Sequence, residues 1–169
     1  SNERRLGIIN SKIFQGKSLS YNNIVDGDTA LSCVSSFLEP SCVIVKHANP
    51  CGVSSRNKLI DAYEKAFETD KTSAFGGVIA FNKEVDENLA RKILENQFVE
   101  IIISPSFSKE SLEIFKSKKD IRVIEYKDYK DINESKNVQI KSINDGILIQ
   151  GEDINYEVII DDIVSKKEP

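Results

Sequence analysis

Lys46 and His47 are the neighbouring residues in this chain that are best suited to chemistry. They follow the continuous apolar run of residues 43–45, which is typical of a strand buried on both faces. An imidazole can take a proton near neutral pH, and an ammonium beside it can stabilise a developing oxyanion, so the pair suits acyl-type transfer. A lone histidine is more often structural, and a surface lysine beside a hydrogen-bonded histidine therefore stays open as the alternative.

The position of this pair depends on how the strand before it ends. In an open α/β sheet ligands collect beyond the carboxyl ends of the strands, which is where the pair is expected to lie. Successive strand residues point to opposite faces, so Lys46 and His47 can share a pocket only if the strand ends or twists between them. Pro50 favours an extended Asn49, and Gly52 permits a sharp turn before the next helix, so the sequence predicts a shaped loop over residues 46–52.

A second candidate element is the run of small residues around Phe75, between residues 70 and 77. Gly76 and Gly77 would let backbone N–H groups approach a ligand closely, which suits a phosphate or a polar heterocycle. A plain turn with Phe75 in the core is the alternative interpretation. The segment over residues 15–23 is polar and predicts only a structured loop.

The composition excludes several classes of protein. Acidic residues exceed basic ones by 27 to 23, for a net charge of −4, so no nucleic acid partner is expected. No apolar run is long enough to span a membrane, and the first residues do not resemble an export signal. A cytoplasmic protein is the expectation. The chain has no methionine and opens with Ser1-Asn2, which suggests a piece of a longer protein.

The cysteines favour neither a metal site nor a disulfide. Cys33, Cys42 and Cys51 are odd in number and nine residues apart, without a C-x-x-C pair. His47-Ala48-Asn49 follows the H-x-E motif of zinc deaminases only in outline, because Asn49 replaces the glutamate and no P-C-x-x-C follows. No metal is expected. Cys51 as a thiolate nucleophile is a weaker alternative.

Apolar periodicity predicts helices that alternate with short buried strands. The predicted helices span residues 26–38, 57–68, 86–96 and 108–118, with Asp26 or Asp28, then Asn57, Asp86 and Ser108 as N-caps. The predicted strands span residues 42–45, 78–81, 99–103, 121–124, 146–150 and, as a candidate, 158–160, with an exposed loop over 127–136. This alternation predicts parallel pairing in a three-layer α/β/α sandwich, with residues 1–169 as a single domain.

Several of these stretches together resemble the aminoimidazole carboxamide ribonucleotide (AICAR) transformylase domain of the bifunctional purine biosynthesis family, which also carries an IMP cyclohydrolase domain. The most specific is the string Lys46-His47-Ala48-Asn49-Pro50-Cys51-Gly52. The others are Gln15-Gly16-Lys17, residues 19–23, Asp70 with residues 73–77, Ile102-Ile103 with Pro105, and the strand over 146–150. The resemblance covers nearly all of the chain.

The resemblance implies transfer of a formyl group from 10-formyltetrahydrofolate to the 5-amino group of AICAR, without a metal. In the family the lysine and histidine of this motif are catalytic, and they fall here on Lys46 and His47. His47 would be the base, and Lys46 would stabilise charge on the formyl oxygen or position the substrates. Nucleotide contacts would come from the remaining matched positions, Ser73, Phe75, Gly76, Gly77 and Glu100. The resemblance also implies a cytidine deaminase-like fold and a homodimeric parent protein.

The chain also departs from the family pattern. An Arg-Tyr-Gly-x-Asn-Pro-His-Gln stretch, expected upstream of Gln15, has no counterpart, and Asp145 stands where the family usually has glycine. The chain is expected to be the N-terminal half of the transformylase domain, without the second half or the cyclohydrolase domain, and to be inactive alone. A catalytically silent nucleotide-binding or assembly module with the same fold is the alternative.

Overall fold

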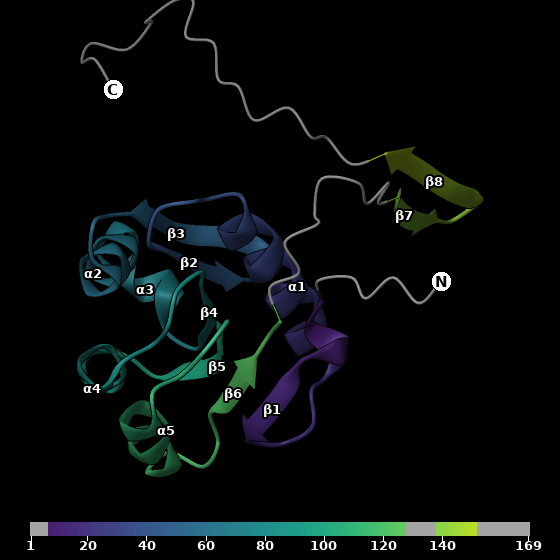
Figure 1. Ribbon diagram of the computed structural model, residues 1–169. Helices are drawn as coiled ribbons and strands as arrows, with labels where there is room; N and C mark the ends of the chain where they lie inside the picture. Colours follow the sequence, from purple (N-terminus) through teal and green to yellow (C-terminus); the bar gives the residue numbers. More distant parts are fainter. Residues whose placement is uncertain (1–6, 128–137, 152–169) are drawn as a thin grey trace, which may run out of the picture. The chain divides into compact units, whose positions relative to one another are not determined.

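The computed structural model describes residues 7–127 and 138–151 (Figure 1). The chain divides into two compact units, residues 1–130 and 131–169, and each is described by itself. The prediction that all 169 residues form one domain stays a prediction.

The first unit contains a six-stranded mixed sheet in the order β1-β6-β5-β4-β2-β3. Its strands are β1 (Lys12–Gln15), β2 (Ser41–Lys46), β3 (Asn49–Ser55), β4 (Gly77–Phe81), β5 (Val99–Ser104) and β6 (Arg122–Glu125). Strands β4, β5 and β6 are parallel, as predicted, whereas β1, β2 and β3 pair antiparallel. The expectation of parallel pairing is wrong for β2. Strand β3, which was not predicted, follows β2 after only two residues, and parallel strands need a long crossover.

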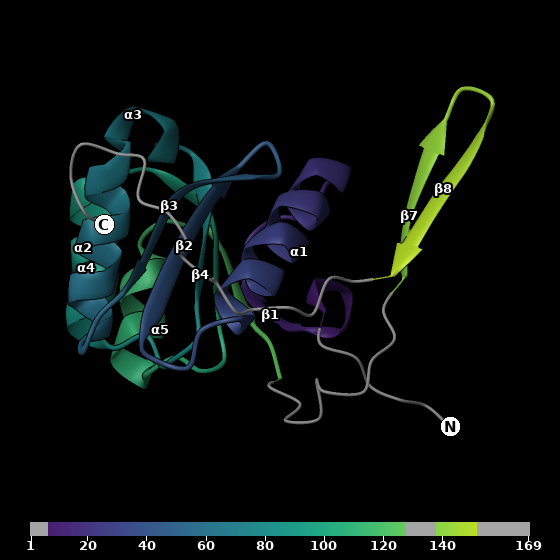
Figure 2. The same cartoon turned by 90° about the horizontal axis from the view of Figure 1, so that it is seen from above.

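Helices cover both faces of this sheet. They are α1 (Tyr21–Ser35), α2 (Leu59–Thr69), α3 (Lys71–Ala74), α4 (Glu87–Asn96) and α5 (Lys109–Lys116), with a short 3₁₀ helix, η1 (Ile8–Asn10). Figure 2 shows α1 on one side of the sheet and α2, α4 and α5 on the other. Two buried apolar clusters match these two interfaces. The predicted three-layer α/β/α sandwich is confirmed, and its cytidine deaminase-like label stays a prediction.

Helix starts were predicted well where a single side chain caps the helix. Asp86 accepts a hydrogen bond from the backbone N–H of Leu89, and Ser108 caps α5 in the same way. Asn57 does not cap α2, which begins after Lys58 without a side-chain cap.

Helix α1 begins earlier than predicted. Ser20 and Asn23 form a capping box, each side chain accepting from the backbone of the other. Asp26 and Asp28, the predicted caps, therefore lie inside the helix. The segment over residues 15–23 is likewise not all loop, since it also includes the end of β1.

The described part of the second unit is a hairpin of β7 (Val138–Ile143) and β8 (Gly146–Gly151). The strand over 146–150 is confirmed, and the Asn144-Asp145 turn joins it to β7, which the sequence analysis missed. The predicted loop over 127–136 and strand over 158–160 lie outside the described residues, apart from Lys127.

Tyr63 on α2 should resist ionisation. Its ring is fully buried, and burial raises the pKa of its hydroxyl to about 12, although a hydrogen bond from Gln97 lowers it in part. Because the folded-state pKa exceeds the unfolded value, the contribution to stability is complete below about pH 10 and is lost as pH rises toward 12. We expect the free energy of unfolding to fall by roughly 2–3 kcal/mol over that pH range.

Among the 5 tyrosines of the chain, Tyr63 should contribute a late step to the tyrosinate absorbance. Tyr63→Phe should remove the contribution of Tyr63 to that late step and weaken the fall in unfolding free energy between pH 10 and 12. Simultaneous titration of all tyrosines near their ordinary pKa would contradict the burial of this hydroxyl.

Candidate functional site

The candidate site is organised by the turn between β2 and β3. Strand β2 ends at Lys46, which pairs with Asn49 across the two-residue turn His47-Ala48. Both turn residues have φ 56°, the left-handed region, as in a type I′ turn. The break required between Lys46 and His47 is therefore present, and the chain reverses there.

The loop predicted over residues 46–52 is shorter than expected, because β3 begins at Asn49. Gly52 is not at a turn and packs against α2, where an added Cβ would lie 2.1 Å from the carbonyl oxygen of Ala66. Pro50 is tolerated because β3 is an edge strand, where a missing N–H costs least. The glycine in this motif therefore serves packing between β3 and α2.

Lys46 reaches the bend at Phe75. Its Nζ donates a hydrogen bond to the carbonyl oxygen of Phe75 at 2.8 Å. The Phe75 ring is 57% exposed and lies beside Phe98, with 5.8 Å between the ring centroids. The alternative that Phe75 belongs to the core is wrong: its side chain is exposed, and its main-chain carbonyl oxygen is bound by the Lys46 ammonium.

The small residues before β4 are partly engaged within the protein. The Ser73 hydroxyl donates to Asp70, which also caps α3 and whose pKa is lowered mainly by that hydroxyl. Gly76 has φ 73° and donates its N–H to the carbonyl oxygen of Phe98 at 2.8 Å. Gly77 is buried, and an added Cβ would meet the Val45 carbonyl oxygen at 3.0 Å. Substrate contacts by Ser73, Gly76 and Gly77 stay predictions.

Glu100 is linked to the first turn of α1. The buried Asn23 side chain donates through Nδ2 to Glu100 Oε2 at 3.0 Å, while its Oδ1 accepts from the Ser20 backbone. One side chain therefore caps α1 and holds the half-buried carboxylate at the start of β5.

Asp26 holds the turn that carries His47. Its Oδ1 accepts the backbone N–H of Ala48 at 2.7 Å, and its Oδ2 accepts that of His47 at 3.3 Å. The Asn49 side chain donates to the His47 carbonyl oxygen, and the imidazole is exposed. Asp26 and Asn23 were not predicted as site residues. Their spacing of three on one helix face was the available signal.

These residues gather at one edge of the sheet, but that edge differs from the expected one. Lys46 lies at the carboxyl end of β2, beside Gly77 and Glu100 at the amino ends of β4 and β5. Because β2 runs antiparallel to β4, the rule for carboxyl ends of parallel strands does not apply to this edge. The site therefore lies at the carboxyl end of β2, as expected, but at the amino ends of β4 and β5.

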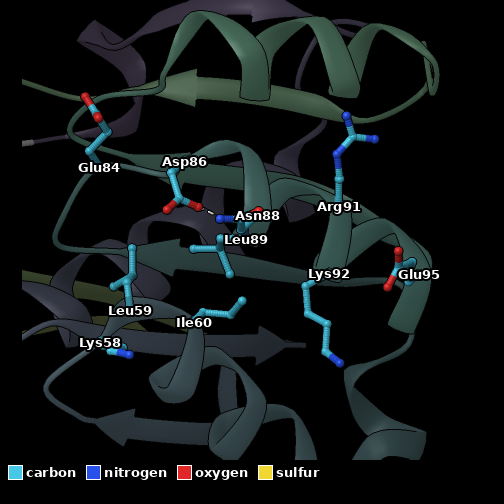
Figure 3. Close-up of a pocket in the computed structure, with 10 residues that line it drawn as sticks. All are labelled: Lys58, Leu59, Ile60, Glu84, Asp86, Asn88, Leu89, Arg91, Lys92 and Glu95. Carbon is cyan, nitrogen blue, oxygen red and sulfur yellow. Dashed lines mark hydrogen bonds between the residues drawn. The ribbon is translucent and has the colours of Figure 1, made fainter.

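A cavity of about 740 Å³ lies elsewhere, between α2 and α4, and Glu84 and Asp86 place it past the carboxyl end of β4 (Figure 3). It is lined by Lys58, Leu59, Ile60, Glu84, Asp86, Asn88, Leu89, Arg91, Lys92 and Glu95. None of the predicted site residues lines it.

Cys51 is poorly suited to act as a nucleophile. Partial burial raises the pKa of its thiol above the ordinary value, and the backbone hydrogen bond and the Lys46 ammonium oppose this only in part. The thiol lies 3.5 Å from the carbonyl oxygen of Ile44. At neutral pH it is protonated, which disfavours the thiolate alternative.

Metal ligands and membrane spans concern the described ranges only, 7–127 and 138–151. These ranges contain no group of three or more histidine, cysteine or acidic side chains placed to hold a metal ion. No helix within them is long and apolar enough to cross a membrane.

Comparison with solved structures gives a weak similarity. A crystal structure described as a candidate formate dehydrogenase accessory protein from Desulfotalea psychrophila aligns with a TM-score of 0.39 and 11% identity. The alignment covers 65% of this chain and 42% of that chain. Similarity at this level establishes neither a common fold nor a common function.

The family comparison is decisive. The model of the AICARFT/IMPCHase bienzyme family matches residues 1–169, the whole of the chain. The family takes part in purine biosynthesis, in agreement with the resemblance carried by the Lys46-to-Gly52 motif. The chain belongs to the AICARFT/IMPCHase bienzyme family.

Proposed function

We propose that this chain contributes to formyl transfer from 10-formyltetrahydrofolate to the 5-amino group of AICAR. The observation that carries the proposal is one hydrogen bond: Lys46, directly before the turn at His47, donates from its ammonium to the main-chain carbonyl oxygen of Phe75, whose side chain is exposed. Family membership supports the reaction class.

In this proposal His47 is the general base. The amine of AICAR is conjugated with a carboxamide and is a poor nucleophile, so its proton must leave as the nitrogen attacks the formyl carbon. An exposed imidazole on a fixed turn is suited to accept that proton. The new bond joins the amine nitrogen to the formyl carbon, and the bond from that carbon to the folate nitrogen breaks. The folate nitrogen leaves with a proton, which His47 can return.

Lys46 stabilises the negative charge that develops on the formyl oxygen. Its ammonium is held by one hydrogen bond to the Phe75 carbonyl oxygen and retains two further donors. Phe75 would contact a planar part of the nucleotide, together with Ser73, Gly76 and Gly77. Glu100, held by Asn23, would accept hydrogen bonds from ribose hydroxyls.

The alternative is a catalytically silent module that binds the nucleotide or serves assembly. One observation favours it: the Lys46 ammonium and the Gly76 N–H are both already paired within the protein. The two functions differ in their dependence on folate, because only the transferase needs it.

Calorimetric titration and an assay of tetrahydrofolate release, on this chain and on the full-length protein, separate them. Formyl transfer should require both substrates in the full-length protein, and the chain alone should be inactive. Ribonucleotide binding with neither folate binding nor turnover in the full-length protein would support the silent module instead.

A further inference from the structure

The turn that carries His47 is built from residues that do not favour it. Type I′ turns require positive φ at both central positions and are dominated by Asn-Gly, Asp-Gly and Gly-Gly. Here His47 and Ala48 both have φ 56°, although each carries a Cβ that disfavours this region. The hairpin register alone does not explain why these two positions carry non-glycine residues, since glycine at position 48 would adopt the same turn at a lower conformational free energy.

Asp26 supplies the stabilisation that the turn lacks. Its carboxylate accepts the two successive N–H groups of the turn, from Ala48 at 2.7 Å and from His47 at 3.3 Å. Hydrogen bonds to an ionised acceptor are stronger than those between neutral groups. Asp26 is itself fixed in the second turn of α1, whose first turn is capped by the Ser20–Asn23 box.

The same helix face also orients the other side of the site. Asn23, three residues before Asp26, donates to Glu100 on β5. Helix α1 therefore connects, through two neighbouring side chains, the turn after β2 and the carboxylate at the start of β5. Small displacements of α1 would move both groups together.

We propose that Asp26 is a positioning residue for His47: it holds the left-handed turn and thereby sets the direction of the imidazole. The inference rests on the proposed role of His47 as the base. Because a misplaced catalytic group can cost about a hundredfold in rate, loss of Asp26 should lower kcat strongly while KM for AICAR changes little.

The test compares Asp26→Ala, Asp26→Asn and the double variant Asp26→Ala with Ala48→Gly, all in the full-length protein. Asp26→Ala should lower kcat about tenfold to a hundredfold. Asp26→Asn keeps one oxygen that can accept the Ala48 N–H, so its kcat should fall less than that of Asp26→Ala. In the double variant glycine adopts the turn without a Cβ, so kcat should recover in part.

The matched control is Asp86→Ala, because Asp86 also accepts a backbone N–H, that of Leu89 at 2.8 Å, but caps α4 away from the site. It should lower the melting temperature without lowering kcat at a temperature where the protein is folded. If the role of Asp26 were merely structural, Asp26→Ala would behave like Asp86→Ala: its melting temperature would fall and its kcat would be unchanged.

The outcomes are distinguishable from failure of the proposed function. If His47→Ala keeps turnover, the assignment of the base is wrong, and this positioning role is wrong with it. If His47→Ala loses turnover but Asp26→Ala keeps kcat, the positioning role alone is overturned. Failure of Ala48→Gly to restore any kcat would also contradict an action through the turn.

Discussion

His47→Ala in the full-length protein should lower kcat for formyl transfer by about 10²- to 10⁴-fold, the usual contribution of a general base. The fold should be unaffected, because the hydrogen bonds that hold His47 involve its main-chain N–H and carbonyl groups, which alanine retains. Alanine also has the same Cβ in the same left-handed conformation. Steady-state kinetics and a thermal melt on the same sample measure both effects.

Lys58→Ala is the matched control for this prediction. Lys58 lines the cavity between α2 and α4, so its replacement tests whether the chemistry takes place there instead. We expect its kcat to stay close to that of the unchanged protein. A loss of turnover in Lys58→Ala, with turnover retained in His47→Ala, would move the active site to the other cavity.

Gly52→Ala should have the largest effect on stability. The added Cβ would lie 2.1 Å from the carbonyl oxygen of Ala66 and 2.8 Å from its carbonyl carbon. These are backbone atoms of α2, so β3 and α2 must move apart. We expect a loss of about 3 kcal/mol, which corresponds to a fall of roughly 6–12 °C in melting temperature.

Two other glycines calibrate this result. An alanine at Gly7 meets nothing within 4 Å, and the extended φ of 176° suits any residue, so its melting temperature should not change. An alanine at Gly27 meets the Ile8 Cδ1 atom at 2.2 Å, but that side-chain tip can rotate away, and an intermediate loss is expected. Equal melting temperatures for all three variants would show that β3 does not pack against α2 as described.

The layered fold was predictable because burial leaves a clear pattern in the sequence. Strand β4 is a continuous apolar run, β5 contains the apolar run of residues 101–103, and α4 has an amphipathic pattern with a capping aspartate. The direction of β2 was not predictable from this pattern, because a strand buried on both faces has the same continuous apolar sequence in parallel and antiparallel sheets. The turn at His47-Ala48, which decides the direction, lacks the glycine that normally marks such a turn.

The site was predictable only in part, for a related reason. Lys46 and His47 could be found because their side chains carry the chemistry. Asp26 was noticed only as a possible helix cap, and its contact with the turn joins residues 21 and 22 positions apart in the chain. Such long-range contacts have no periodic signal in a single sequence. Phe75 was predicted to contact the nucleotide, with a place in the core as the alternative interpretation, and its exposed side chain contradicts that alternative.

The most direct test is a crystal structure of the full-length protein with AICAR bound. If the turn after β2 carries the base, a ring nitrogen of His47 should lie within about 2.6–3.2 Å of the 5-amino nitrogen, or reach it through one water. The planar ring of the bound nucleotide should then contact Phe75. A nucleotide bound in the cavity between α2 and α4, with its amine out of reach of His47, would contradict the account.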